Sequence, residues 1–254
     1  MATRSPIVSV LGHVDHGKSS ILDRIRGTNI VAGEAGGITQ AIGASIIPLE
    51  TIQKKCGKLL EALNMDLTIP GLLFIDTPGH AAFTNLRKRG GNLADIAILV
   101  VDLNEGLKAQ TKEAIEILLS YKTPFIIAAN KLDLVPGYRK ASEFVIQDIE
   151  AQSPRTKELI QTKIYELVGQ IFDLTKLESD RFDSVDDYTK KLAIIPTSAV
   201  SGQGISELLM VLTGLAQRYF EEHLKIDVEG MGKGTILEVK EEKGLGTTMD
   251  LILY

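Results

Sequence analysis

The chain has 254 residues, a formal net charge of −5 and a hydrophobic fraction of 44%. This length and composition fit one large α/β domain, or one domain with a piece of another, and supply enough apolar residues for a buried core. The acidic balance excludes a chain that binds nucleic acid over its whole surface, so any contact with RNA needs a local surface.

Cysteine content and apolar run length predict a cytoplasmic chain with no membrane association. Cys56 is the only cysteine, so no intrachain disulfide can form, as is usual in a reducing compartment. The N-terminus lacks the charged start and long apolar segment of a signal peptide. The longest apolar runs, such as residues 96–101, have the length of a strand and are too short to span a bilayer. No pattern indicates oligomerisation, so we expect a monomer.

Apolar, β-branched runs alternate along the chain with stretches of helical periodicity. This alternation predicts βαβ units around a mostly parallel sheet flanked by helices, which is an α/β fold. Ligands of such folds bind at the carboxyl ends of the strands. The strands are predicted at residues 6–11, 41–47, 71–76, 96–102, 124–129 and 192–196, and the helices at 18–26, 50–64, 80–92, 108–120, 139–151, 155–176 and 203–221.

Two stretches exceed what a minimal α/β nucleotide-binding domain needs. Residues 50–68 carry a lysine-rich helix, and residues 138–190 are long, charged and helical. We interpret both as solvated helical cover, and the alternative for each is a partner surface. The last part of the second stretch is expected to be a solvated loop or a short helix, because it concentrates the acidic residues Glu178, Asp180, Asp183, Asp186 and Asp187.

The end of the chain has a different pattern from the rest. Residues 235–239 and 247–253 are strand-like and flank a glycine-rich turn, which predicts a hairpin. Two strands do not make a stable unit alone, so we expect them to open a second, β-barrel domain of which the chain contains only the first strands. The predicted division is residues 1–224 for the first domain and 225–254 for the second.

The strongest motif is GHVDHGKS at residues 12–19, between an apolar run and a helix-like stretch. It matches the phosphate-binding loop G-x-x-x-x-G-K-[ST] in the strand–loop–helix setting that this loop requires. Its glycines allow backbone N–H groups to approach phosphate oxygens, and the following helix adds its positive dipole end. Lys18 can reach the β- and γ-phosphates, and the hydroxyl of Ser19 can bind Mg²⁺. The alternative is an ordinary glycine-rich turn.

A second motif, DTPGH, occupies residues 76–80 at the end of an apolar run. Asp76 can hold Mg²⁺ through a water molecule. Gly79 can offer its N–H to the γ-phosphate, and His80 stands where a residue would orient the attacking water. The alternative is a turn with an N-capping Asp or Thr.

A third motif, NKLD, occupies residues 130–133 directly after an apolar run. The carboxylate of Asp133 can accept both N1–H and N2–H₂ of guanine, which adenine lacks, so it would select GTP over ATP. Asn130 can contact the N7 side of guanine or brace neighbouring loops. The aliphatic stem of Lys131 can lie on the base plane.

Two weaker signals complete the pattern. In TSAV at residues 197–200, the N–H of Ala199 can meet the O6 atom of guanine, although a plain turn explains this stretch equally well. In GGITQ at residues 36–40, the glycine pair suits a segment that closes over phosphate, with Thr39 as a second hydroxyl ligand of Mg²⁺.

Together these motifs resemble the GTPases of the translational factor superfamily, and within it initiation factor five-B, the archaeal and eukaryotic counterpart of bacterial initiation factor two. The resemblance covers residues 6–222 as the G domain and about 230–254 as the start of a β-barrel domain. It implies GTP hydrolysis that times ribosomal subunit joining and factor release. It also implies contact with the large-subunit GTPase centre, and initiator tRNA binding only through domains that this chain does not contain.

The resemblance also implies roles for individual residues. His80 would orient the nucleophilic water, Lys18 would supply positive charge, and Asp15 would help to hold a monovalent cation (K⁺ or Na⁺) with a carbonyl near Gly37. The alternative for Asp15 is a bond to loop amides. The nucleotide site would comprise Asp15, His16, Gly17, Lys18, Ser19, Ser20, Thr39, Asp76, Gly79, Asn130, Lys131, Asp133, Ser198, Ala199 and Val200, with Ser19, Thr39 and Asp76 around Mg²⁺.

The histidines need an interpretation of their own, and for the whole chain two alternatives remain open from the residues themselves. The rings of His13, His16 and His223 are interpreted as loop-packing or surface groups rather than metal ligands, because no partners stand at zinc spacing. The whole chain could be a nucleotide-gated binding module with negligible turnover of its own. It could also be a GTPase of another class, such as an elongation or ribosome-biogenesis factor.

Overall fold

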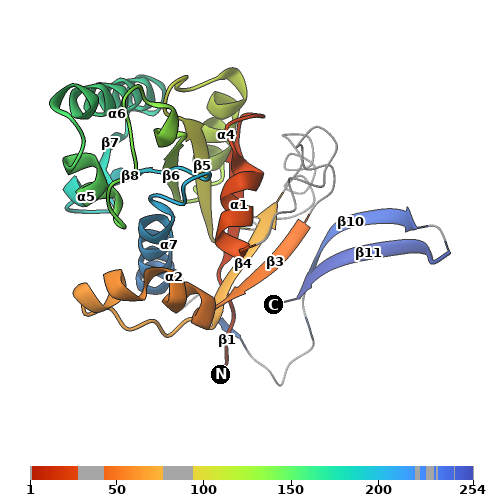
Figure 1. Ribbon diagram of the computed structural model, residues 1–254. Coiled ribbons are helices and arrows are strands. Elements are labelled where there is room, and N and C mark those ends of the chain that lie inside the picture. Colours follow the sequence, from red (N-terminus) through yellow and green to blue (C-terminus); the bar gives the residue numbers. More distant parts are fainter. Residues whose placement is uncertain are drawn as a thin grey trace.

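A seven-stranded sheet lies at the centre of the computed structural model (Figure 1). The structure describes residues 2–27, 43–76 and 94–220, together with 224–226, 232, 234–242 and 244–253. The strand order is β3-β4-β2-β5-β6-β8-β7, and every pairing is parallel except β3 with β4. The predicted α/β fold is therefore confirmed. The strands are β2 (Ile7–Gly12), β3 (Gly43–Pro48), β4 (Gly71–Asp76), β5 (Ile96–Asp102), β6 (Phe125–Asn130), β7 (Glu178–Arg181) and β8 (Lys191–Pro196).

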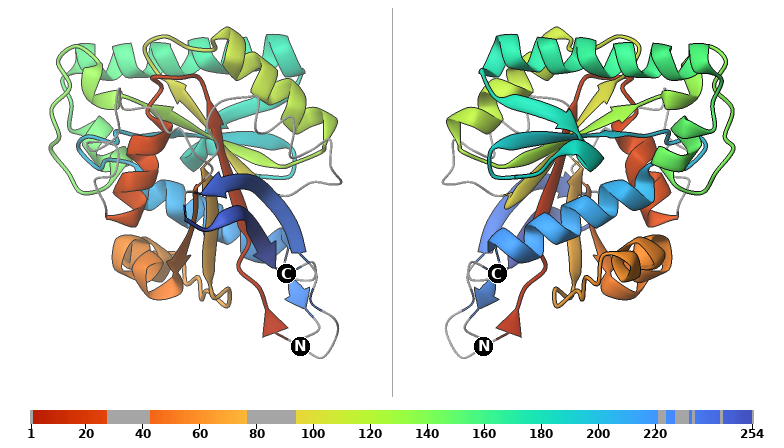
Figure 2. Two further views of the ribbon diagram at one scale, coloured as in Figure 1. Left: turned by 90° about the vertical axis from the view of Figure 1, so that its right-hand side faces the viewer. Right: turned by 90° about the vertical axis from the view of Figure 1, so that its left-hand side faces the viewer.

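Helices cover both faces of this sheet, which explains why its central strands are apolar throughout. All residues of β5 and β6 are buried, as expected when neither face of a parallel sheet meets water. Figure 2 shows α1 on one side of the sheet and α4 on the other, and α7 packs against both α1 and α2. The helices are α1 (Lys18–Arg26), α2 (Leu49–Ala62), α4 (Ala109–Ser120), α5 (Val145–Glu150), α6 (Pro154–Thr175) and α7 (Ile205–Phe220), with short 3-10 turns η3 (Leu132–Leu134) and η4 (Phe182–Ser184).

Most predicted elements are present close to their expected bounds. The helix at 18–26 and the strands at 71–76 and 96–102 match residue for residue. In α1 this agreement follows from glycines in left-handed conformation at both ends, Gly17 and Gly27, which stop the helical backbone on either side. The helix predicted at 80–92 lies outside the described residues.

The prediction of a helix at residues 139–151 was wrong over its first half, because only α5 (Val145–Glu150) within this range is helical. The carboxylate of Asp148 accepts hydrogen bonds from the backbone N–H groups of Ala141 and Ser142, and it also accepts one from the hydroxyl of Tyr138. Two backbone N–H groups of this segment are thus satisfied without a helix. A buried carboxylate thus organises an irregular loop where the local pattern favoured a helix.

The acidic stretch after α6 was predicted to be a loop or a short helix, and this was only partly correct. Its first residues form β7, which pairs in parallel with β8 at the edge of the sheet, and η4 follows directly. Ser179 and Phe182 are buried and anchor the stretch, while its carboxylates remain at least partly exposed. Residues 178–181 form a strand because their main chain pairs with β8, and this pairing has no signal in the local sequence.

A separate two-stranded hairpin follows the last helix, as predicted. Strands β10 (Gly234–Glu242) and β11 (Gly246–Leu253) pair only with each other in the described residues. Ile252 is buried and packs with Ile7 of β2 and Ile75 of β4, so the hairpin contacts these two strands of the sheet. A further short pairing joins β1 (Ala2–Thr3) to β9 (Lys225–Ile226).

Among the described residues, no helix combines the length and the apolar character needed to cross a membrane.

Candidate nucleotide-binding site

Four of the predicted motifs follow parallel strands of the same sheet, which are β4, β2, β6 and β8 in spatial order, with β5 between β2 and β6. Residues 12–19 begin at the end of β2, Asp76 ends β4, Asn130 ends β6, and Thr197 follows β8. Because these strands run parallel, their carboxyl ends meet at one edge, where α/β proteins bind ligands. We call residues 12–19 the phosphate loop and residues 130–133 the base loop, after the roles that their motifs predict.

The phosphate loop is tight enough to need glycine at both of its ends. A Cβ atom on Gly12 would lie 2.2 Å from the carbonyl oxygen of Val100, and one on Gly17 would lie 2.4 Å from Nδ2 of Asn130. Both residues also have a positive φ, 144° and 90°, that L-residues rarely adopt. Gly17 therefore allows the base loop to approach the phosphate loop.

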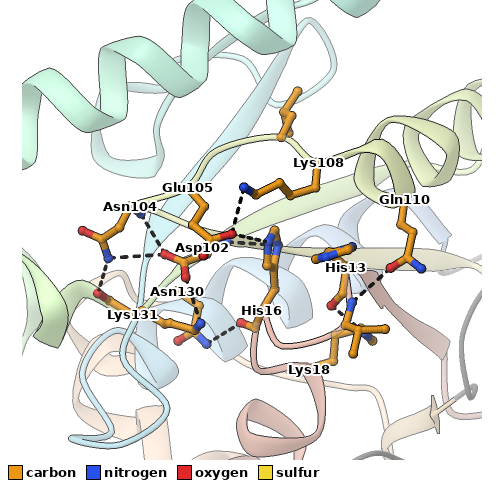
Figure 3. A network of polar contacts seen from close by, with 12 residues as sticks. His13, His16, Lys18, Asp102, Asn104, Glu105, Lys108, Gln110, Asn130 and Lys131 are labelled. Carbon is orange, nitrogen blue, oxygen red and sulfur yellow. Dashed lines mark hydrogen bonds and ion pairs between the residues drawn. The ribbon is translucent and has the colours of Figure 1, made fainter.

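Side chains hold the phosphate loop in its curve (Figure 3). The ammonium group of Lys18 donates to the carbonyl oxygen of His13 at 2.7 Å, and the N–H of Val14 donates to Oε1 of Gln110 at 3.1 Å. Asp15 is exposed and occupies the left-handed region at φ 64°. The Lys18 ammonium group thus lies within the loop that the motif assigns to phosphate.

The His16 ring is buried beneath this loop, in agreement with its interpretation as a loop-packing group. Its side chain is 1% exposed, and its Nδ1 atom accepts a hydrogen bond from the N–H of Asp102 at 3.2 Å. Burial and the neighbouring His13 ring lower the pKa of His16, so the ring is neutral near pH 7 and carries its proton on Nε2. The two rings lie edge to face, with centroids 5.0 Å apart.

Asn130 braces three loops at once. Its Nδ2 donates to the carbonyl oxygen of His16 at 2.9 Å, and its Oδ1 accepts from the N–H of Ala199 at 3.1 Å. These two bonds are the bracing role considered for Asn130. The Ala199 N–H, which the motif assigns to O6 of guanine, is donated to Asn130 here.

Lys131 is held on the opposite side of the same loop. Its ammonium group pairs with Oδ2 of Asp102 at 2.8 Å, and its carbonyl oxygen accepts from Nδ2 of Asn104 at 3.1 Å (Figure 3). Burial favours a raised pKa for Asp102, but the hydrogen bonds from Lys131 and Asn104 outweigh it and hold the pKa below its usual range. Asp102 is therefore an anion at neutral pH.

The remaining residues predicted to contact the base lie close to this brace. Asp133 is half-buried in η3, and Val200 is 79% exposed in the loop after β8. Ser198 is buried, and its hydroxyl accepts from the N–H of Ser201 at 3.0 Å. Leu132 donates its N–H to the carbonyl oxygen of Thr197 at 3.0 Å, which joins the base loop to the loop that follows β8.

The predicted Mg²⁺ ligands can be located in part. Ser19 and Ser20 lie half-buried in the first turn of α1, and Asp76 ends β4 in register with Val10 of β2. Ser19 and Asp76 are residue types that supply the oxygen ligands Mg²⁺ prefers, and they stand at the start of α1 and at the end of the strand next to β2, so these residue types fit this ion. Thr39, Gly79 and His80, together with Gly37, lie outside the described residues.

Three residues of this network were missed by reasoning from the sequence: Asp102, Asn104 and Gln110. Asp102 had a usable signal, because a carboxylate at the end of an apolar run follows the same pattern as Asp76. Asn104 and Gln110 had none, because both act through loops that lie far away in the chain.

Residues 3–218 match the family described as the elongation factor Tu GTP binding domain. The chain belongs to this family. It is 60% identical over its whole length to a protein of Methanopyrus kandleri named "Probable translation initiation factor IF-2", and 58% identical over 99% of its length to the protein of the same name from Methanocella arvoryzae.

A solved structure agrees with this assignment. GDP-bound aIF5B from Aeropyrum pernix is 50% identical over the whole chain, with a TM-score of 0.87. The resemblance to the initiation factor five-B branch is therefore confirmed, and the chain is a G domain of this type of translational GTPase. The chain spans 42% of the length of each of these three relatives.

Proposed function

We propose that this chain is the GTP-binding and GTP-hydrolysing G domain of a translation initiation factor that promotes ribosomal subunit joining, with hydrolysis as the switch for release. The observation that carries the proposal is the Asn130 brace, which places the phosphate loop against the base loop. A nucleotide needs both loops at a fixed separation, since its base and its phosphates are bound at opposite ends.

Asp133 selects guanine in this proposal. It follows the braced Asn130 by three positions and lies in η3 with its carboxylate half-buried. A carboxylate there accepts two N–H bonds from guanine, and an adenine in the same pose leaves it unpaired. Lys131, held by Asp102, places its aliphatic stem along the base. Ser198, Ala199 and Val200 line the same end of the site.

The phosphates are assigned to residues 15–20. Backbone N–H groups of the loop and the N-terminus of α1 surround them, and Lys18 changes partner from the His13 carbonyl to phosphate oxygens. Ser19, Asp76 and Thr39 would hold Mg²⁺, with Asp76 acting through water. When bound, this ion neutralises charge on the β- and γ-phosphate oxygens.

Hydrolysis then needs a positioned water molecule. Its oxygen forms a bond to the γ-phosphorus while the bond to the β–γ bridging oxygen breaks, giving GDP and phosphate. His80 is proposed to orient this water and not to remove its proton, which the γ-phosphate can accept. Asp15 is proposed to hold K⁺ or Na⁺ beside the transferred group, and its exposure at the loop apex supports this role.

We also propose a domain boundary after residue 224. Residues 1–224 form the G domain, and residues 225–254 form the first strands of a second, β-barrel domain. The separate pairing of β10 with β11 supports this division. The partner proposed for the G domain is the GTPase centre of the large ribosomal subunit.

Single-turnover GTP hydrolysis tests the proposal, measured with and without large ribosomal subunits. We expect strong stimulation by the subunits. If this chain binds GTP but the subunits do not stimulate its hydrolysis, the same assay is repeated with a longer chain that includes the segments its relatives carry. A longer chain that also fails to respond would overturn the ribosomal role.

A further inference from the structure

Asp102 stands at the centre of the polar network, although no motif assigns it a role (Figure 3). It ends β5 and is in register with Asn130 of the neighbouring strand β6. Only 3% of the residue is exposed, yet it remains an anion. A buried charge costs free energy unless its partners compensate, so these partners indicate what the residue does.

The carboxylate of Asp102 holds the base loop. Its Oδ2 pairs with the ammonium group of Lys131 at 2.8 Å, and its Oδ1 accepts from the N–H of Asn104 at 2.8 Å. Asn104 then donates its side-chain amide to the Lys131 carbonyl at 3.1 Å. The Asp102 carboxylate thus holds the Lys131 ammonium group directly and the Lys131 carbonyl group through Asn104.

This fixation is needed because the Lys131 backbone is in an unusual conformation. Its φ is 64°, in the left-handed region that residues with a Cβ seldom adopt unless their surroundings impose it. The residues that follow, including Asp133, take their direction from this turn. The geometry of the base-contacting carboxylate therefore depends on Lys131, and Lys131 depends on Asp102.

The backbone of Asp102 holds the phosphate loop. Its N–H donates to Nδ1 of His16 at 3.2 Å, while the His16 carbonyl accepts from Asn130. Leu103, the next residue, donates its N–H to the Asn130 carbonyl at 2.9 Å. The end of β5 thus contacts both loops that a nucleotide must bridge.

We propose that Asp102 is a positioning residue for nucleotide binding, which fixes Lys131 and thereby aligns the base loop with the phosphate loop. It touches no part of the nucleotide itself and acts through Lys131. The proposal rests on the assignment of residues 130–133 to the base. Loss of the carboxylate shortens the residence time of GDP, because the base loop then samples conformations that do not match guanine.

The test is the rate of GDP release, measured by chasing a fluorescent GDP analogue from Asp102→Asn, Lys131→Met and the double variant. Asp102→Asn is expected to speed release by about tenfold, in the range seen for coupled buried pairs. If Asp102 acts through Lys131, the double variant will release GDP no faster than Lys131→Met alone. Additive effects of the two substitutions would overturn the proposal.

Asp95 offers a matched control at the opposite end of β5, where it directly precedes the strand. Its carboxylate is 14% exposed and binds Arg4 through two bonds of 2.7 and 2.8 Å, together with the N–H of Ile7. Asp95→Asn is expected to lower thermal stability while leaving GDP release unchanged. Faster release from Asp95→Asn, by as much as from Asp102→Asn, would show that destabilisation alone explains the effect and would refute the proposal.

A second route remains if Asp102→Asn does not fold. Asn104→Ala removes the two bonds of the side-chain amide, one to Asp102 and one to the Lys131 carbonyl, without leaving either charge of the pair alone. It is expected to speed GDP release by about threefold. Release at the wild-type rate from a folded Asn104→Ala protein would overturn the proposal.

Asp133→Asn separates this proposal from the function on which it rests. Its release rates for GDP and for xanthosine diphosphate report the base assignment directly. An unchanged preference for guanine would overturn the base assignment and the Asp102 proposal together. A switched preference, combined with additive effects of Asp102→Asn and Lys131→Met, would overturn the Asp102 proposal alone.

Discussion

The side-chain amide of Asn130 donates to the carbonyl oxygen of His16 at 2.9 Å, across 114 positions of the sequence. The contact is buried, and it joins the end of one central strand to the loop that follows another. It holds the phosphate loop against the base loop, so several measurable properties depend on it.

Replacement of Asn130 by alanine should lower both stability and nucleotide affinity. The substitution leaves the His16 carbonyl and the Ala199 N–H without their partner, which should cost about 3 kcal/mol in unfolding free energy. Urea unfolding measures this loss. The exposed Gln161 on α6, changed to alanine, is the control, with an expected change within about 0.5 kcal/mol. Equal effects at both positions would contradict the bracing role.

Substitution by alanine is predicted to have opposite effects at Gly17 and at Gly57. Gly17→Ala places a Cβ 2.4 Å from the Asn130 amide at a φ of 90°, so GDP affinity should fall by at least about tenfold. Gly57→Ala, inside α2 with no atom within 4 Å of the new Cβ, should stabilise the protein by about 0.5–1 kcal/mol. Calorimetric GDP titration and thermal unfolding of both variants test the pair. A Gly17→Ala protein with wild-type affinity would rule out the tight approach of the two loops.

His80→Ala should separate hydrolysis from binding. The residue is proposed to orient water and not to bind GTP, so the single-turnover rate should fall by at least about 100-fold while GTP affinity is retained. His223→Ala serves as control and should leave both quantities unchanged, because the sequence predicts a loop-packing or surface residue at this position and no role in the site. Parallel loss of affinity and rate in His80→Ala would indicate a structural role instead.

Asp15→Asn tests the monovalent cation. Asparagine tolerates the left-handed backbone of this position, so the substitution removes the charge with little strain. We expect the stimulation of hydrolysis by K⁺ or Na⁺ to disappear while GDP binding persists. Hydrolysis rates measured across a series of KCl concentrations provide the readout, and a dependence equal to that of the wild type would assign Asp15 to loop packing.

Glu207 on α7 should make stability depend on pH. Burial raises its pKa above the usual range, although the N–H of Val145 donates to it at 2.6 Å. Its folded pKa therefore exceeds its unfolded pKa, so its contribution to stability is complete below the unfolded value and is lost as pH rises through the folded value. Urea unfolding between about pH 4.5 and about pH 8 should show this loss, and Glu207→Gln should lack it. Parallel curves for the two proteins would contradict the raised pKa.

Elements with strong local determinants were predictable from the sequence. The glycines at both ends of α1 and the unbroken apolar run of β5 fix these elements through nearest neighbours alone. Where a side chain of the following segment or a neighbouring strand decides the backbone, the local pattern predicts the wrong structure. The loop of residues 138–144 is irregular because Asp148 accepts the N–H groups of Ala141 and Ser142, and β7 is a strand because β8 lies beside it.

The same distinction holds for the site. The sequence by itself determined the fold class and the phosphate and base motifs, because these depend on residue types at short, fixed spacings and on apolar periodicity. Only the tertiary structure decided that Asn130 binds His16 and that Asp102 binds Lys131. Those contacts follow from which strands lie side by side and in what register, and the packing of the whole sheet determines both.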